Sequence, residues 1–395
     1  MEKLGIYIQV PFCQTKCTYC NFHTGVVAAG RFAPYTAAVC SEIRKREAFW
    51  KLGGVRVPDG IAGADTVYIG GGTPSLLEPK LLADILDTIR GQFDCDFREI
   101  TLEADPETID ADKAAKWLAA GINRVSFGAQ SFIDDELKAA GRMHRRADIY
   151  RAVPILRRAG IGSISFDLIA GLPKQTTVSW GKSLEECVAL SPEHISIYMM
   201  EIDEGSRLGL EVLTGGARYS AKDLPLEESM AEFYETAQEL LEQAGYAQYE
   251  ISNWAKPGFA SEHNLKYWRR EPYYGFGAGA HSFSGIQRWA NTHDAAAYVE
   301  AISNGRPAVQ TLDEMTPIGA LEEELFLGLR QLAGINLARI EQQYGVSFEE
   351  KVTGLASSGM IERVGQMVRL PADKLSVSNE IIVELLRRDS SSRNF

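Results

Sequence analysis

Short apolar runs alternate with amphipathic stretches over the first half of the chain. Six of the runs are rich in β-branched and aromatic residues and have strand character; they span residues 4–10, 66–69, 99–103, 124–128, 163–169 and 195–199. The stretches between them carry the helical period, at residues 35–49, 80–91, 110–120, 134–140, 147–159 and 178–190. Strands that alternate with helices predict a parallel sheet with right-handed crossovers. The runs read as apolar throughout, which is typical of a sheet covered on both faces or closed into a barrel.

The residues that follow these strands favour a barrel over a flat sheet. Each predicted strand ends in side chains suited to chemistry: a cysteine loop, a run of three glycines, and then Glu103, Gln130, Asp167 and Glu201. Functional side chains at the C-terminal end of every strand are typical of β/α barrels, whereas a flat doubly wound sheet gathers them at one switch point. We therefore predict an α/β fold in which residues 1–210 form a partial (β/α)6 barrel.

The second half of the chain has a different texture. A long amphipathic helix at 227–245 leads into an aromatic-rich stretch at 246–283, and we predict a barrel-associated segment over residues 211–290. Helical patterns at 321–332, 337–344 and 348–359 precede a hairpin pattern at 360–370 and a last helix at 378–388. Residues 291–395 are thus predicted to form a mostly α-helical C-terminal domain with a small winged-helix-like hairpin.

The charge balance limits the kinds of partner. Forty-one basic residues against fifty-three acidic ones give a formal net charge of −12. Because binding to a phosphate backbone needs a basic face, this balance argues against nucleic acid, and the winged-helix-like region is predicted to be a packing module. No apolar run reaches the roughly 18 residues of a membrane span, and the N-terminus lacks the layout of a signal peptide. We expect a cytoplasmic protein without membrane insertion, in at most peripheral contact with a membrane.

Three of the six cysteines lie close together, directly after the first predicted strand. Cys13, Cys17 and Cys20 place three thiolates on one loop, whereas Cys40, Cys95 and Cys187 are isolated and are predicted to be small buried hydrophobic residues. An iron–sulfur cube normally takes four cysteines, so three would leave one iron open to a small molecule. The alternative is a zinc ion with His23 as the fourth ligand.

The spacing of these cysteines carries a family resemblance. Cys13-x3-Cys17-x2-Cys20, with Tyr19 before the last cysteine, resembles the radical S-adenosylmethionine (SAM) family. The resemblance implies a [4Fe-4S] cluster whose open iron binds SAM, and an electron from the cluster that cleaves the sulfonium to give a 5′-deoxyadenosyl radical. The glycine run at residues 70–72, followed by a threonine and a proline, is similar to the glycine-rich element of that family. The alternative is that these glycines only form a tight turn.

A closer resemblance covers nearly the whole chain. YIGGGTPS, LEADPE, SFGAQSF, GRMH, FDLIAGLPKQT and HISIYMME are similar to the coproporphyrinogen III oxidase-like group of radical SAM proteins. That group has an oxygen-independent oxidase branch, HemN, and a haem-chaperone branch, HemW. The chaperone branch is favoured by the short segment before the first strand, by Asn21 where the oxidase has a further cysteine, and by HNLKYW at residues 263–268, which fits the HNxxYW signature of that branch.

The resemblance also implies roles for individual residues. The cysteine triad would hold the cluster, and nine residues would contact SAM or a second SAM molecule: Tyr7, Tyr19, Gly71, Gly72, Thr73, Glu103, Gln130, Arg142 and Asp167. His263 is the candidate axial ligand of haem, with a hydrogen-bonded structural histidine as the alternative. No catalytic residue is singled out. The histidines at 144, 194, 281 and 293 are given no role, and Met199 and Met200 are expected to pack in the sixth strand.

Two functional classes follow from this interpretation. A haem chaperone would bind haem and pass it to a haem-accepting respiratory protein, with an electron donor serving the cluster. An enzyme would instead be a coproporphyrinogen III dehydrogenase, which removes hydrogen and carbon dioxide from porphyrinogen propionates by SAM radical chemistry. A haem-degrading radical methyltransferase is a distant third. The HNxxYW element favours the chaperone.

Overall fold

Six parallel strands form the centre of the main sheet in the computed structural model, which describes residues 3–58 and 63–387. In sheet order they are β1 (Lys3–Val10), β4 (Gly63–Gly71), β5 (Asp94–Ala104), β6 (Arg124–Gln130), β7 (Ser163–Ala170) and β8 (His194–Met199). Every neighbouring pair is parallel. The predicted strand order and direction are therefore confirmed.

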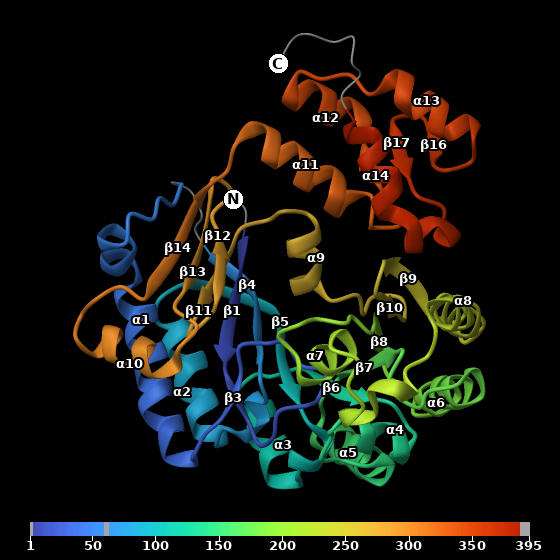
Figure 1. Cartoon of the computed structure of the whole chain (residues 1–395). Coiled ribbons are helices and arrows are strands. Elements are labelled where there is room, and N and C mark those ends of the chain that lie inside the picture. The colour runs from blue at the N-terminus through green and yellow to red at the C-terminus, as the bar shows by residue number, and fades with distance from the viewer. Residues whose placement is uncertain (1–2, 59–62, 388–395) are drawn as a thin grey trace.

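Helices connect these strands and cover the outer face of the curved sheet (Figure 1). They are α1 (Phe32–Leu52), α2 (Pro79–Arg90), α3 (Ala111–Ala119), α4 (Asp134–Ala139), α5 (Arg146–Ala159) and α6 (Thr177–Ala189). All six predicted helices are present, with ends that shift by a few residues. Thr176 shows why one of them begins where it does: its hydroxyl caps α6 by accepting a hydrogen bond from the backbone of Ser179.

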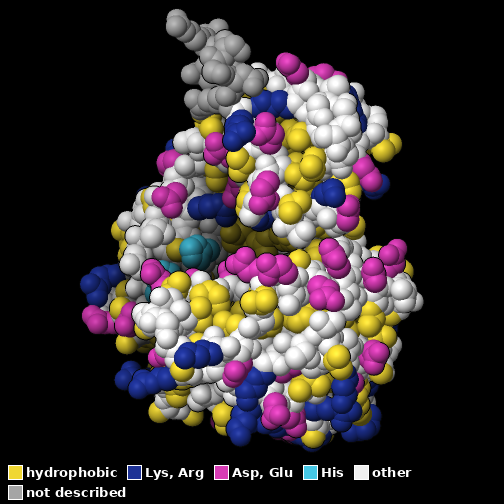
Figure 2. Space-filling model, turned by 45° about the vertical axis from the view of Figure 1, so that its right-hand side comes forward, with side chains coloured by type: hydrophobic (Ala, Val, Ile, Leu, Met, Phe, Trp, Pro, Cys, Tyr) yellow, Lys and Arg dark blue, Asp and Glu magenta, His cyan; other side chains and the backbone are white. Residues whose placement is uncertain are grey.

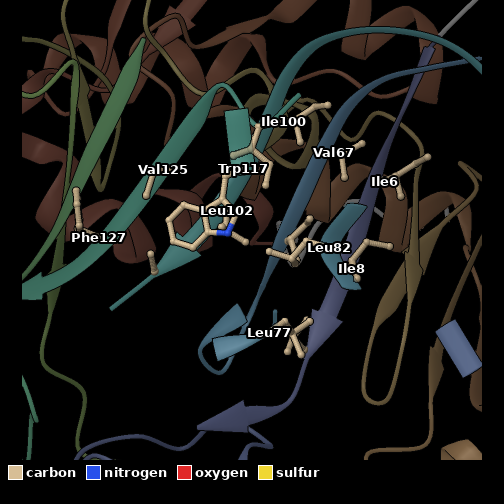
Figure 3. Close-up of a cluster of buried hydrophobic side chains, with 14 of the residues drawn as sticks. Ile6, Ile8, Val67, Leu77, Leu82, Ile100, Leu102, Trp117, Val125 and Phe127 are labelled. Carbon is tan, nitrogen blue, oxygen red and sulfur yellow. The ribbon is translucent and has the colours of Figure 1, made fainter. Parts of the chain in front are cut away.

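Side chains alternate between the two faces along most of each central strand, with an irregularity in β6 between Phe127 and Gln130. Figure 3 shows the outer face packed against α2 and α3, with all labelled side chains at most 3% exposed: Ile6, Ile8, Val67, Leu77, Leu82, Ile100, Leu102, Trp117, Val125 and Phe127. Because successive residues of a strand point to opposite faces, the residues between them point inward; these are Tyr7, Tyr68, Glu103, Ser126 and Asp167. The expectation of runs that are apolar throughout is wrong, since the inner face is polar.

Further strands extend the sheet at both edges. On one side are β11 (Tyr273–Phe276), which runs parallel to β1, and then β12 (His281–Phe283), β13 (Gln287–Asn291) and β14 (Val309–Glu314). On the other side are β10 (Asn253–Ala255), antiparallel to β8, and β9 (Ala247–Glu250). The twelve-stranded sheet has β14 and β9 at its two ends, so the barrel is open. The sheet also continues past the predicted domain boundary at residue 291.

A second hydrophobic core lies in the C-terminal region. It is built from α11 (Pro317–Gly328), α12 (Leu337–Tyr344), α13 (Glu349–Ser357), α14 (Ser378–Leu386) and a three-stranded sheet of β15 (Ile335–Asn336), β17 (Met367–Arg369) and β16 (Glu362–Val364). The predicted helices and hairpin are confirmed. The first helix begins earlier than predicted, because Thr316 caps it and Pro317 occupies its first turn, and it ends earlier, at Gly328. The predicted final residue of the last helix, Arg388, lies outside the described residues.

The remaining elements include α8 (Glu227–Gln243), which confirms the predicted long amphipathic helix, and several short elements. The short elements are β2 (Phe12–Cys13), β3 (Gly25–Val26), α7 (Arg207–Leu213), α9 (Glu262–Trp268), α10 (Ala295–Ser303) and five 3₁₀ helices (Ala29–Arg31, Pro74–Leu76, Pro106–Thr108, Arg218–Asp223 and Ala372–Val377). Among the helices in residues 3–58 and 63–387, none combines the length and the apolar character needed to cross a membrane.

A buried carboxyl group on α1 ties the added strands to the central sheet. The Glu42 side chain accepts hydrogen bonds from the Gly277 backbone (3.0 Å), the Asn291 amide (2.7 Å) and the Tyr298 hydroxyl (2.6 Å). Burial raises the pKa of Glu42 to about 7, and these three donors only partly offset the effect. The folded protein therefore binds a proton at this site at a pH where the unfolded chain has released it.

This difference predicts a pH dependence of stability. Since the pKa is raised on folding, the contribution of Glu42 is present at pH 4.5 and is lost as the pH rises to about 7, at most about 3 kcal/mol. We expect Glu42→Gln to remove that part of the slope in the free energy of unfolding, measured by urea denaturation at a series of pH values. Glu47→Gln, on the exposed side of the same helix, should leave the slope unchanged; a Glu42→Gln slope equal to the wild-type slope would contradict the assignment.

Candidate cluster and cofactor site

A cavity of about 730 Å³ lies at the C-terminal ends of the central strands. Figure 2 shows a hollow between the barrel and the C-terminal region, with hydrophobic side chains inside it and acidic side chains along its lower rim. The cavity brings together most of the predicted site residues: Cys13, Cys17, Cys20, Tyr19, Gly71, Gly72, Thr73, Glu103, Gln130, Arg142 and Asp167. Tyr7 and His263 lie elsewhere.

The cysteine loop is clamped at its base and held along its length. The strands β2 and β3 pair in parallel, with Phe12 opposite Gly25, and so close the loop between them. In its middle, the backbone N–H of Thr18 donates to Ala140 at the end of α4, and its carbonyl accepts from Leu208 of α7. These contacts hold the three thiols on the wall of one cavity.

The donor set fits an iron–sulfur cluster. All three cysteines are free thiols, and Arg142 donates from Nη1 to the sulfur of Cys17 at 3.5 Å. Within residues 3–58 and 63–387, no three His, Cys, Asp or Glu side chains converge as they would around a single metal ion. His23, the fourth ligand of the zinc alternative, stacks instead on His293 with ring centroids 3.9 Å apart. In a cluster each thiolate binds its own iron, so convergence on one point is not required.

The glycine run lies directly against the cysteine loop. The backbone N–H groups of Gly72 and Thr73 donate to the carbonyls of Val10 (2.8 Å) and Phe12 (2.7 Å). A Cβ on Gly72 would lie 2.5 Å from the Phe12 carbonyl oxygen, and Gly71 has a φ of +115° that favours glycine. The backbones of the glycine run and of Phe12 therefore meet where only glycine fits. The glycine run, called the glycine strap below, leaves space beside the thiols.

Two half-buried carboxyl groups face the cavity from the inner side of the sheet. Glu103 accepts hydrogen bonds from the Tyr68 hydroxyl and the Gly71 backbone, both at 2.9 Å. Burial, with Asp167 nearby, raises the pKa of Glu103 to about 7. Burial raises the pKa of Asp167 to about 6, partly offset by hydrogen bonds that include one from Ser126 at 3.2 Å. Amino or hydroxyl groups of a ligand would stabilise the charged forms of both carboxyl groups.

Other polar atoms of the cavity wall lack partners among the described residues. Arg142 forms an ion pair with Asp105 and donates to the Gly128 carbonyl at 2.8 Å, but its Nε is buried without an acceptor. The carboxamide oxygen of Gln130 is also buried without a donor, on a residue with a φ of +64°. Since buried polar atoms normally have partners, and strained backbone gathers at ligand sites, this wall fits a polar ligand such as SAM.

Two predicted site residues do not line the cavity. Tyr7 donates to Gln9 at 2.6 Å, and its ring centroid lies 6.1 Å from that of Tyr68, which does line it. His263 is fully buried on α9, with Nδ1 2.8 Å from the Thr66 hydroxyl and Nε2 2.8 Å from the Tyr267 hydroxyl. Burial lowers the pKa of His263 to about 3, so the ring is neutral. The role of His263 as a haem ligand stays a prediction. To bind the haem iron, one ring nitrogen would have to give up its hydrogen bond to Thr66 or Tyr267.

The structure adds cavity residues that sequence reasoning missed. They come from the end of β8, from β9–α9 and from the C-terminal region, and include Tyr198, Met199, Ile251, Trp268 and Arg330. The prediction that Met199 packs inside the strand is wrong, since the side chain is 38% exposed and faces the cavity. Met200 does pack, in a small core with Leu172 and Leu208. One feature of the sequence could have identified Tyr198 and Met199 as cavity residues: they lie at the end of a predicted strand, next to the predicted rim residue Glu201.

The isolated cysteines largely fit the prediction. Cys40 and Cys187 are buried, and Cys95 is half-buried on β5, away from the cavity. None of them joins the triad.

Comparison with known proteins agrees with this architecture. The chain matches the family model of the radical SAM superfamily over residues 7–187 and that of the HemN C-terminal domain over residues 315–372. The solved structure of the Escherichia coli coproporphyrinogen III oxidase HemN, described as a radical SAM enzyme, has a TM-score of 0.80 at 22% identity, over 97% of this chain and 90% of that one. An open β/α barrel with three cysteines after its first strand thus defines a radical SAM protein, and the superfamily implies a [4Fe-4S] cluster and SAM.

Sequence relatives place the chain within that class. It is 35% identical to "Heme chaperone HemW" of Bacillus subtilis, over 95% of this chain and 97% of the relative. It is 31% identical to the protein of the same name from Lactococcus lactis, over 97% of each chain. The Danio rerio "Radical S-adenosyl methionine domain-containing protein 1, mitochondrial" is 33% identical over 84% of this chain and 73% of its own. The chain belongs to the HemW family.

The cysteine assignment predicts the fate of the cluster in a variant. We expect Cys17→Ser to lose most of its iron and its visible absorption after anaerobic reconstitution, because serine is a poor replacement for a thiolate ligand. Iron content, acid-labile sulfide and the absorption spectrum measure this. Cys95→Ser removes a thiol on β5 away from the cavity and should retain the cluster. Full iron and sulfide in Cys17→Ser would remove Cys17 from the ligand set.

The contact between the glycine run and Phe12 predicts a second effect. We expect Gly72→Ala to destabilise the fold by about 1–3 kcal/mol, because the new methyl group meets backbone atoms that cannot rotate away. The displaced strap should also weaken SAM binding. Thermal unfolding and isothermal titration calorimetry with SAM measure the two effects.

A glycine with open space provides the control. Gly181 lies inside α6 and a Cβ there meets nothing within 4 Å, so Gly181→Ala should be neutral or stabilise by up to about 1 kcal/mol. If Gly72→Ala behaves like Gly181→Ala in both measurements, the close backbone contact has no importance for the site.

Proposed function

We propose that this chain is a cytoplasmic haem chaperone of the radical SAM type, which binds haem and delivers it to a haem-accepting respiratory protein. One observation carries the proposal: the wall of a single cavity combines polar groups suited to a cluster and SAM with a set of apolar and aromatic side chains. The latter comprises Ile197, Tyr198, Met199, Ile251 and Trp268. A flat, largely apolar macrocycle suits that wall. The names of the relatives given above agree with this interpretation.

The polar residues of the cavity wall have separate tasks in the proposal. Cys13, Cys17 and Cys20 hold a [4Fe-4S] cluster and leave one iron open. With SAM bound, such a centre supplies one-electron chemistry at the sulfonium. Glu103 and the glycine strap face the SAM molecule beside the thiols. An electron donor is a required partner if that chemistry is used.

Arg142, Gln130 and Asp167 form the neighbouring part of the polar wall. In the proposal the orphaned Gln130 oxygen accepts a ligand N–H or O–H, and Arg142 keeps a positive charge beside the thiolate of Cys17. Tyr7 acts indirectly in the proposal: its ring stacks on that of Tyr68, which lines the cavity. The described residues thus provide one polar site next to the open iron, with room for SAM.

The enzymatic alternative is tested in the same experiment. Anaerobically reconstituted protein is titrated with haem, and is separately incubated with coproporphyrinogen III, SAM and a low-potential reductant. We expect saturable binding of haem, seen in the Soret band, and no decarboxylated porphyrin above the level of a Cys17→Ser control. The HNxxYW element and the Asn21 position favour that result.

Two different outcomes would overturn the chaperone proposal. Decarboxylated porphyrin that depends on the cluster would make the protein a coproporphyrinogen III dehydrogenase. A chain that binds no haem and makes no product would overturn the chaperone proposal without supporting the enzyme.

A further inference from the structure

Arg330 presents a guanidinium group to the cavity from the C-terminal region. It follows α11 and lines the same cavity as the cysteine loop, together with Ser376, Ser378 and Asn379. No sequence motif pointed to this residue, and the polar site described above does not use it.

The arginine is held in place on both its backbone and its side chain. Its carbonyl accepts a hydrogen bond from the Ile251 N–H at 3.0 Å, next to the end of β9. Its Nη2 donates to the Asn379 amide oxygen at 2.6 Å, and its guanidinium carbon lies 3.6 Å from the centroid of the Phe326 ring. A planar group fixed by an amide and an aromatic face is preorganised for a ligand.

Its charge has no counter-ion among the residues that the structure describes. Arg330 makes no ion pair there, and its Nε is buried without an acceptor. In contrast, the other arginine of the cavity, Arg142, pairs with Asp105. A half-buried cation without a carboxylate is costly, and burial lowers the pKa of Arg330 accordingly. An anionic group on a ligand would supply the missing partner.

The neighbouring wall indicates what kind of ligand carries that anionic group. Around Arg330 the cavity is lined by Ile251, Trp268 and Tyr234, and it continues to Tyr198 and Met199. A ligand that contacts both this apolar wall and the Arg330 guanidinium has a broad apolar body and a carboxylate. Haem and other tetrapyrroles that carry propionate side chains have this chemistry.

We propose that Arg330 binds a carboxylate of the tetrapyrrole cargo, an inference that rests on the haem-binding function proposed above. The guanidinium offers its free N–H donors to the carboxylate, while Asn379 and Phe326 keep it in orientation. SAM also carries a carboxylate, so the test separates the two sources.

The experiment compares haem with haem dimethyl ester, in which both carboxylates are blocked. Wild-type protein should bind haem at least about tenfold more tightly than the ester, because the ester cannot pair with the arginine. Arg330→Gln should weaken binding of haem by about ten- to a hundredfold and leave the affinity for the ester unchanged. Soret titrations measure all four affinities, and calorimetry with SAM should give the wild-type value for Arg330→Gln.

A matched arginine serves as the control. Arg369 lies on β17 in the same region, forms an exposed ion pair with Glu362 and does not line the cavity. Arg369→Gln should bind haem like the wild type. Thermal unfolding and cluster absorption establish that each variant is folded, and the wild-type comparison of haem with its ester does not depend on any variant.

The outcomes that overturn the inference differ from those that overturn the function. Equal haem affinity in wild type and Arg330→Gln, or equal affinity of the wild type for haem and the ester, would remove Arg330 from the cargo site while haem binding stands. Loss of SAM binding with haem binding intact would assign the arginine to SAM. Absence of haem binding in the wild type would overturn the proposed function, and this inference with it.

Discussion

The alternation of side chains along each parallel strand is the constraint on which the rest of the molecule depends. Residues such as Leu102 and Phe127 point outward and are buried by the helices, so their neighbours Glu103 and Ser126 must point inward. A shift of one residue in any strand would exchange the two sets and place carboxyl groups in the hydrophobic core. The packing of the outer face therefore determines which side chains reach the cavity, although none of the packing residues touches a ligand.

The polar inner face has an energetic consequence of its own. Carboxyl groups that are partly removed from water without a full set of partners hold their protons more tightly, which agrees with the raised pKa values of Glu103 and Asp167. The side chains of the outer core are buried, and burial of their apolar surface is the source of the stability that compensates for this cost. The stability of the apolar outer core thus compensates for the cost of the polar site, and the two lie on opposite faces of a single sheet.

The sequence allowed prediction of the features that depend on local pattern. The six parallel strands, their helices and the cysteine loop follow from periodicity and spacing, and the structure confirms the strands and helices. The edge strands could not be predicted because they are short and their partners are distant; β11 pairs with β1 through Tyr273 and Gly5. The same reason applies to Arg330, whose place at the cavity depends on how two separate cores pack together. His263 shows a different limit: the motif favoured a haem ligand, whereas hydroxyl groups lie at hydrogen-bond distance from both ring nitrogens, as in the alternative of a hydrogen-bonded structural histidine.

The open end of the sheet at β9 gives the C-terminal region a second task. The segment after α11 lies along this edge: Glu250 bridges to Gln331, the Ile251 N–H donates to Arg330, and the Leu332 N–H donates to Tyr249. An uncovered edge strand would offer these backbone groups to another molecule and favour aggregation. The C-terminal region that completes the cavity therefore also covers the edge strand β9. A change that moved this region away to admit a larger ligand would at the same time expose the backbone groups of β9 to other molecules.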